Sequence, residues 1–111
     1  MARLNYVELP VREIGKAKAF YETAFGWSLT EFGPTYAATM TGDTDIGLQA
    51  DASEAAKAPL PVIDVANLEA ALEAVEKAGG TRTRAIFAFP GGRRFQFLDP
   101  SGNELACVQA E

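Results

Sequence analysis

The chain has 111 residues, of which 48% are hydrophobic and 23% are charged, a balance typical of one globular domain with a single hydrophobic core. Its formal net charge of −5 and the lack of any Lys/Arg block argue against non-specific binding to nucleic acid. The chain contains no histidine, which excludes histidine-dependent triads, zinc deaminase sites and sites of two histidines and one carboxylate.

The first half of the chain predicts a strand, a helix and three short strands. Apolar residues alternate around Leu9, and then recur at three- and four-residue spacing, which predicts a helix from about Glu13 to Phe25 that ends at Gly26. Its N-terminus lacks a favoured capping residue. Strand-like runs follow at Trp27–Glu31, Tyr36–Thr41 and Ile46–Gln49. The pattern leaves open whether Trp27 contributes to packing or to the rim of a cavity.

The second half repeats the first. A shift of 54 positions places Leu9 on Ile63 and Gly26 on Gly80. Asn67 is the predicted N-cap of the second helix, and Gly79 its left-handed stop. The strands predicted after it are Thr81–Phe87, Arg93–Leu98 and Glu104–Gln109. We therefore predict a single α+β domain over residues 1–111, with βαβββ modules at about 1–50 and 60–111 and a linker at about 51–59.

Alternation divides the strand residues between two faces of the sheet. One face is apolar throughout and should lie beneath the helices as the core, with Cys107 as a buried and inert thiol within it. The other face mixes aromatic, aliphatic and polar groups, as ligand cavities do. An exposed sheet or a dimer interface with a polar fringe would show the same mixture. The predicted cavity residues are Tyr6, Glu8, Leu60, Val62, Arg94, Gln96, Glu104 and Ala106.

Four segments of the chain resemble the vicinal-oxygen-chelate superfamily, which includes glyoxalases, bleomycin-resistance proteins and extradiol dioxygenases. These segments are Tyr6–Val11, Ala19–Trp27, Ala74–Gly80 and Pro90–Leu105. The resemblance covers nearly the whole chain in order. It implies that the paired βαβββ modules curl into an incomplete barrel around a cavity, and that the chain forms a homodimer.

Catalytic members of that superfamily hold a metal with histidine or glutamate from equivalent strands of the two modules. By local alignment these positions fall here on Tyr6, Leu60 and Ala106, and on either Gly47 or Gln49. Leucine, alanine and glycine side chains cannot coordinate a cation. The resemblance therefore implies a member with no metal and no other cofactor, which argues against metal-dependent glyoxalase or dioxygenase activity.

Three polar residues of the predicted cavity face allow further interpretations. Glu8 and Glu104 offer carboxylate oxygens to magnesium or calcium. An ion pair with Arg94 explains these carboxylates more simply, because an unpaired buried charge is strongly destabilising. Arg94 is also a candidate for clamping a carboxylate or phosphate, whereas alternation places Arg93 on the opposite face.

Nothing at the N-terminus or in the cysteine content indicates export. Charge interrupts any signal-peptide apolar run, and no stretch approaches the ~20 apolar residues that span a bilayer. A single cysteine cannot form an internal disulfide. We therefore expect a cytoplasmic protein with no membrane partner and no nucleic-acid partner.

The leading hypothesis is a metal-independent domain that binds a small molecule whose identity the sequence does not reveal. A second hypothesis is a metal-independent isomerase or lyase that uses Glu8 as a general base together with Tyr6. A third is a dimerisation or regulatory domain with a vestigial cleft.

Overall fold

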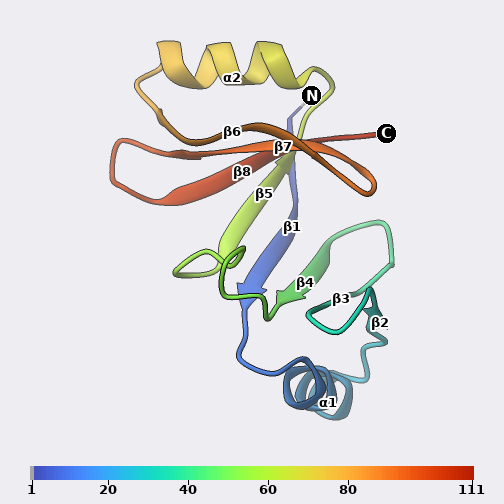
Figure 1. Ribbon diagram of the computed structural model, residues 1–111. Helices are drawn as coiled ribbons and strands as arrows, with labels where there is room; N and C mark the ends of the chain where they lie inside the picture. The colour runs from blue at the N-terminus through green and yellow to red at the C-terminus, as the bar shows by residue number, and fades with distance from the viewer. Residues whose placement is uncertain (1) are drawn as a thin grey trace. The chain divides into compact units, whose positions relative to one another are not determined.

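The computed structural model describes residues 2–111, which form eight strands and two helices (Figure 1). The chain divides into two compact units, Tyr6–Leu60 and Pro61–Glu111, the latter together with the residues that precede Tyr6. The order strand, helix and three strands occurs twice, which confirms the predicted α+β plan of two βαβββ modules. Within the described residues, neither helix is long and apolar enough to cross a membrane.

The first unit contains one helix and four paired strands. They are β1 (Arg3–Pro10, of which Tyr6–Pro10 belong to this unit), α1 (Ile14–Phe25), β2 (Thr30–Glu31), β3 (Tyr36–Ala38) and β4 (Asp45–Gln49). The strands lie in the order β2-β3-β4-β1, and only the β4–β1 pair is parallel. Helix α1 packs on β3 and β4 around a core of Ile14, Leu29, Ala37 and Leu48. Burying a large aliphatic side chain contributes about 1.5–3 kcal/mol, which fixes the strand register.

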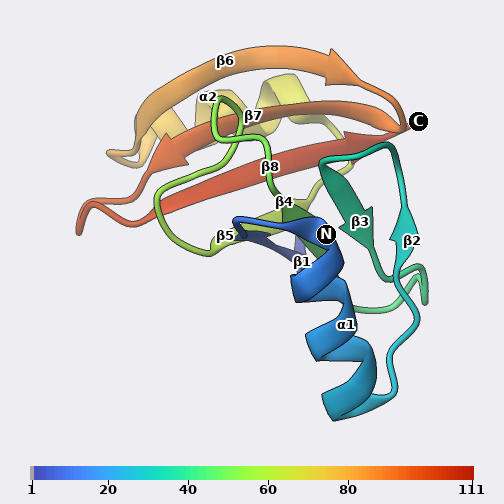
Figure 2. The same cartoon turned by 60° about the horizontal axis from the view of Figure 1, so that its bottom comes forward.

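The second unit has the same plan. It contains β5 (Leu60–Asp64), α2 (Leu68–Lys77), β6 (Thr81–Phe89), β7 (Gly92–Leu98) and β8 (Glu104–Ala110), with strands in the order β5-β8-β7-β6. Helix α2 lies across one face of β6, β7 and β8 (Figures 1 and 2). Its core consists of Leu68, Phe95, Phe97 and Cys107. Burial raises the pKa of the Cys107 thiol to about 11, in agreement with the predicted inert thiol.

The two helices begin differently, as the sequence predicts. Glu13 precedes α1 without any side-chain cap, whereas the Asn67 side chain accepts a hydrogen bond from the Ala70 N–H at 3.0 Å. The Gln109 side chain accepts from the Leu68 N–H at 2.8 Å. Helix α1 ends at Gly26 with a φ of 70°, a left-handed conformation that glycine adopts without a steric cost.

Two strands of the first unit are shorter than predicted, because side chains bind backbone groups that a longer strand would use. The predicted strand Trp27–Glu31 is reduced to its last two residues, and the N–H of Leu29 instead donates to the Glu22 carboxylate at 3.0 Å. The predicted strand Tyr36–Thr41 stops at Ala38. Beyond it, the N–H of Thr41 donates to the Asp45 carboxylate at 3.0 Å.

The Asp45 carboxylate organises the turn between β3 and β4. Its Oδ1 accepts from the Thr39 hydroxyl at 2.6 Å, the Thr41 hydroxyl at 2.8 Å and the Thr41 N–H, while Oδ2 accepts from the Gly42 N–H at 2.9 Å. Burial alone would raise the pKa of Asp45, but these hydrogen bonds outweigh it and hold the pKa below its ordinary value. The ionised form therefore stabilises the fold.

We predict that Asp45→Asn lowers the free energy of unfolding at pH 7 by about 1–3 kcal/mol, because an amide opposes at least one of these donors with an N–H group. The pKa of Asp45 is lower in the folded state. Its contribution is therefore complete above the unfolded-state pKa, near 4, and is lost as the pH falls below that value. Urea unfolding at pH 7 and pH 3 should show the difference between wild type and variant shrinking in acid.

The control is Asp43→Asn, which removes an exposed carboxylate from the same turn and should change the urea midpoint much less. If wild type and Asp45→Asn differ in free energy of unfolding by the same amount at pH 7 and pH 3, the stabilising role of the ionised Asp45 is contradicted.

Candidate functional site

Three side chains of the first unit form a hydrogen-bonded group, here called the tyrosine–glutamate group: Tyr6 and Glu8 of β1 and Tyr36 of β3. The Tyr36 hydroxyl donates to Oε2 of Glu8 at 3.2 Å and lies 2.5 Å from the Tyr6 hydroxyl. The Glu8 residue is only 4% exposed. The structure thus brings together the two residues that the sequence singled out for catalysis, and adds a third.

The Tyr36 hydroxyl carries a single proton, and this sets the direction of the hydrogen bonds. Because Tyr36 donates to the carboxylate, Tyr6 donates to the Tyr36 oxygen. Burial raises the pKa of Tyr36 well above its ordinary value, and the nearby Tyr6 phenol and Glu8 carboxylate raise it further. Tyr36 therefore stays protonated and neutral throughout the physiological pH range.

Gly47 of β4 makes this arrangement possible. It lies opposite Glu8 in the β1–β4 pair and opposite Ala38 in the β3–β4 pair. A Cβ at position 47 would come within 2.0 Å of the Tyr6 hydroxyl and 2.1 Å of the Tyr36 hydroxyl. Of the two positions that the alignment left open in this strand, Gly47 is therefore the one beside Tyr6. The Gln49 side chain instead accepts a hydrogen bond from the Asp51 N–H.

The second unit carries another part of the predicted cavity set. Strand register places Val62, Ala106 and Gln96 side by side across β5, β8 and β7. All three are buried, as is Leu60 of the first unit, so these positions are not a solvated sheet face. Gln96 Nε2 donates to Glu104 Oε2 at 3.0 Å, and that oxygen also accepts from the Thr83 hydroxyl at 2.8 Å.

One buried acceptor in this second cluster has no partner. The Oε1 atom of Gln96 makes no hydrogen bond with any residue in 2–111, although the residue is only 6% exposed. A flip of the amide would break the bond that Nε2 donates to Glu104. Leaving a buried acceptor unsatisfied costs about 1–3 kcal/mol, so a donor other than residues 2–111, on a water or a ligand, would stabilise this atom.

The two arginines after the Pro90–Gly91 turn differ in surroundings. Arg93 pairs with Glu69 of α2, with N–O distances of 2.6 and 3.2 Å, on the helix side as predicted. The Arg94 guanidinium lies 5.2 Å from the ring centre of Phe87. Arg84 lies over the same ring at 3.7 Å. The predicted ion pair between Glu8 and Arg94 joins residues of different units and stays a prediction.

Sequence reasoning missed Tyr36, and one available signal pointed to it. A glycine inside a strand indicates close approach by another group, and Gly47 is such a glycine. Thr83, Phe87 and the orphaned oxygen of Gln96 carried no comparable signal. Alternation assigns a side chain to a face, but it does not state which neighbour that side chain reaches.

The family model of the Glyoxalase/Bleomycin resistance protein/Dioxygenase superfamily matches residues 3–107. The chain belongs to this superfamily. That match extends across both compact units and agrees with the resemblance found in the sequence. No curated protein matches the chain.

Several solved structures share the fold of this chain at low sequence identity. A hypothetical protein from Bacillus halodurans C-125 gives a TM-score of 0.82 at 14% identity, over 99% of this chain and 95% of that one. The methylmalonyl-CoA epimerase of Mycobacterium tuberculosis gives 0.70 at 16%, over 98% and 88%. The Mn(II)-bound glyoxalase of Novosphingobium aromaticivorans gives 0.70 at 20%, over 98% of this chain but 40% of that one.

The metal positions implied by the superfamily do not fit a divalent cation in this chain. At the first position, the Tyr6 phenol is hydrogen-bonded to Tyr36. At the second position, Gly47, the Tyr6 and Tyr36 hydroxyls fill the space that a side chain would occupy. The other two are the buried alkyl groups of Leu60 and Ala106. Across residues 2–111, no group of three or more His, Cys, Asp or Glu side chains is placed to hold a metal ion.

We predict that Gly47→Ala lowers the free energy of unfolding by about 1–3 kcal/mol, because the new methyl group displaces both hydroxyls. The loss should be smaller in a background of Tyr6→Phe and Tyr36→Phe, which removes the two closest atoms. Urea unfolding of the four proteins in this cycle measures the coupling.

Gly15→Ala is the matched control, since a Cβ on that residue of α1 would meet nothing within 4 Å. It should stabilise the protein by about 0.5–1 kcal/mol through the higher helix propensity of alanine. If Gly47→Ala lowers the free energy of unfolding no more than Gly15→Ala does, the close packing of the tyrosines against β4 is contradicted.

Proposed function

We propose that this superfamily member is a metal-independent, small-molecule-binding domain. The observation that carries the proposal is the buried, unsatisfied Oε1 of Gln96, within the set of residues predicted to line the cavity. A ligand that donates an N–H or O–H to this atom would remove the cost of leaving it unpaired. The ligand would thus be selected by a hydrogen-bond donor at this point.

The tyrosine–glutamate group supports the metal-independent part of the proposal. Of the implied metal positions, one holds the Tyr6 phenol and another is Gly47, beside which both tyrosine hydroxyls lie, so this group offers hydrogen bonds to a ligand. Their protons are fixed in direction toward Glu8, so the group is organised before any ligand arrives. That Leu60, Val62, Arg94 and Ala106 line the same cavity remains part of the proposal, as do a homodimeric assembly and a cytoplasmic location.

The isomerase or lyase hypothesis keeps one supporting observation, which is that Glu8 is buried and hydrogen-bonded to a phenol. Such a carboxylate has the surroundings of a general base, but a base also needs a substrate proton within reach. If a turnover is found, Glu8→Gln and Tyr6→Phe should each reduce kcat. A turnover unchanged by both substitutions would leave only the binding function.

The binding function predicts saturable thermal stabilisation by at least one compound in a screen of metabolites and antibiotics, undiminished by EDTA. The hit should bind Gln96→Met at least about tenfold more weakly, because the variant has no acceptor at this position. The same variant removes the unpaired oxygen but also the hydrogen bond from Nε2 to Glu104, so its stability without ligand should stay within about 1 kcal/mol of the wild type. Calorimetric titration and urea unfolding measure the two quantities.

Gln49→Met provides the control, because that amide oxygen already accepts a backbone N–H, and it should leave the affinity unchanged. Stoichiometric manganese, zinc, nickel or iron in elemental analysis of the purified protein would overturn the metal-independent proposal. A screen without any hit would favour the vestigial-cleft hypothesis.

A further inference from the structure

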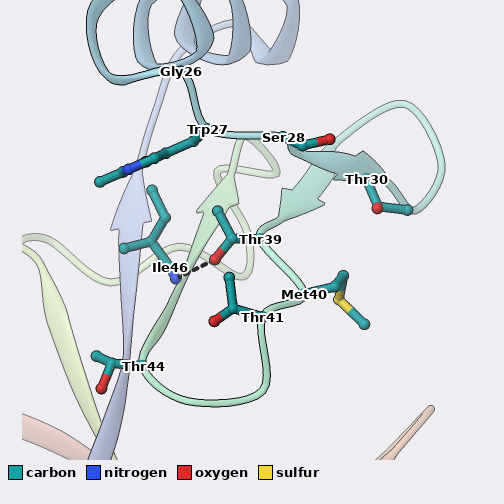
Figure 3. A pocket seen from close by; sticks show the side chains of 9 residues that line it. All are labelled: Gly26, Trp27, Ser28, Thr30, Thr39, Met40, Thr41, Thr44 and Ile46. Atoms are coloured by element: carbon teal, nitrogen blue, oxygen red, sulfur yellow. Dashed lines mark hydrogen bonds between the residues drawn. The ribbon is translucent and has the colours of Figure 1, made fainter.

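A concave site lies in the first unit, apart from the residues on which the proposed function rests, and Trp27 is at its rim. Its volume is about 540 Å³, within the range of small-molecule sites (Figure 3). It is formed by the segment after α1 and by the β3–β4 turn with the start of β4. The lining residues are Gly26, Trp27, Ser28, Thr30, Thr39, Met40, Thr41, Thr44 and Ile46.

The Trp27 indole forms one wall of this site, and aromatic side chains of α1 pack against it. It stacks on Tyr21 with ring centres 5.6 Å apart and an interplanar angle of 8°, and it contacts Phe25 at 5.2 Å. Trp27 is nevertheless 41% exposed. In Figure 3 its ring lies between α1 and the side chains of Thr39 and Ile46, so the exposed part of the indole borders the site. The ring is therefore fixed before a ligand binds.

The side of the site formed by the β3–β4 turn is less polar than its three threonines suggest. The hydroxyls of Thr39 and Thr41 are bound to the Asp45 carboxylate at 2.6 and 2.8 Å. In Figure 3 their methyl groups extend toward the side of Trp27, beside the aliphatic chain of Ile46. The carboxylate that stabilises the turn thus also turns methyl groups toward the site.

The lining contains no Asp, Glu, Lys or Arg. A charged ligand would lose hydration here without gaining an ion pair, which is unfavourable. An anion would also meet the overall charge of −5. A flat, uncharged ring would instead cover the open face of an indole and rest on methyl groups, the contact that aromatic side chains favour.

We propose that this site binds an uncharged aromatic or heteroaromatic group, stacked on Trp27 and packed against Ile46 and the threonine methyl groups. It shares no residue with Tyr6, Glu8, Tyr36 or Gln96, so the proposal is independent of the proposed function. Met40, which is 66% exposed, also lines the site and adds a polarisable thioether to it.

Trp27 is the only tryptophan of the chain, so its fluorescence reports on this site alone. The probe is N-phenyl-1-naphthylamine, which is uncharged and accepts energy from tryptophan. We expect saturable quenching of Trp27 with matching probe emission, and at least about tenfold weaker binding of 8-anilino-1-naphthalenesulfonate, which adds one negative charge to the same rings. Equal affinity for the two probes, or probe emission without quenching of Trp27, would overturn the proposal.

Two variants distinguish probe binding at this site from non-specific binding to exposed hydrophobic residues. Met40→Asp places a charge in the lining and should weaken binding of the neutral probe at least about tenfold. Phe32→Asp makes the same change of charge at a 51% exposed aromatic residue outside the lining, and should leave the affinity unchanged. Circular dichroism and urea unfolding confirm that both variants fold. Equal effects of the two substitutions on probe affinity would contradict the assignment.

A second copy of the chain is the competing occupant, since Phe20, Phe25 and Phe32 are also exposed in this unit. In that case Trp27 emission would depend on protein concentration, and Met40→Asp would convert a dimer into a monomer in analytical ultracentrifugation. That outcome would overturn the small-molecule proposal. Probe binding to wild type with unchanged sedimentation would support it.

Discussion

The absence of a side chain at Gly47 is the constraint on which the chemistry of the first unit depends. The hydroxyls of Tyr6 and Tyr36 lie where a Cβ would project, so the glycine and the pair of phenols require each other. Because the phenols occupy this space, Tyr36 reaches the buried carboxylate of Glu8 and keeps its proton. The missing Cβ on β4 thus allows two tyrosine hydroxyl groups to lie beside the Glu8 carboxylate on this face.

The two modules share a plan but differ in what they bury. Two of the implied metal positions are Tyr6, which carries a phenol, and Gly47, beside which two hydroxyl groups lie. The other two are Leu60 and Ala106, which carry buried alkyl groups. The strand order is the same in each unit, with the first strand parallel to the last and the others antiparallel. Topology is therefore fixed by the apolar core beneath each helix, and the opposite face is left to vary.

The sequence predicted the elements well where periodicity alone determines them. Both helices, the cap at Asn67 and the apolar core around Phe95 follow from spacing and capping chemistry. The first two strands after α1 were predicted too long. The carboxylates of Glu22 and Asp45 bind backbone N–H groups several residues away, and hydrophobic periodicity gives no sign of such contacts. Tyr36 was missed for the same reason, since alternation gives its face but not its contact with Tyr6. The pocket beside Trp27 depends on ring stacking and on threonine rotamers, which no spacing rule describes.

Two buried polar side chains of this fold differ in how many of their hydrogen-bonding atoms have partners. Asp45 accepts four hydrogen bonds from its own turn, so it has a complete structural role without any ligand. Gln96 is buried to a similar degree, yet only its N–H₂ is bound and its oxygen has no partner in the described chain. A fold selected for stability alone would place an apolar residue there, because methionine of similar size carries no such penalty. A hydrogen-bond donor on a ligand would satisfy this oxygen, which is what the proposed binding function requires.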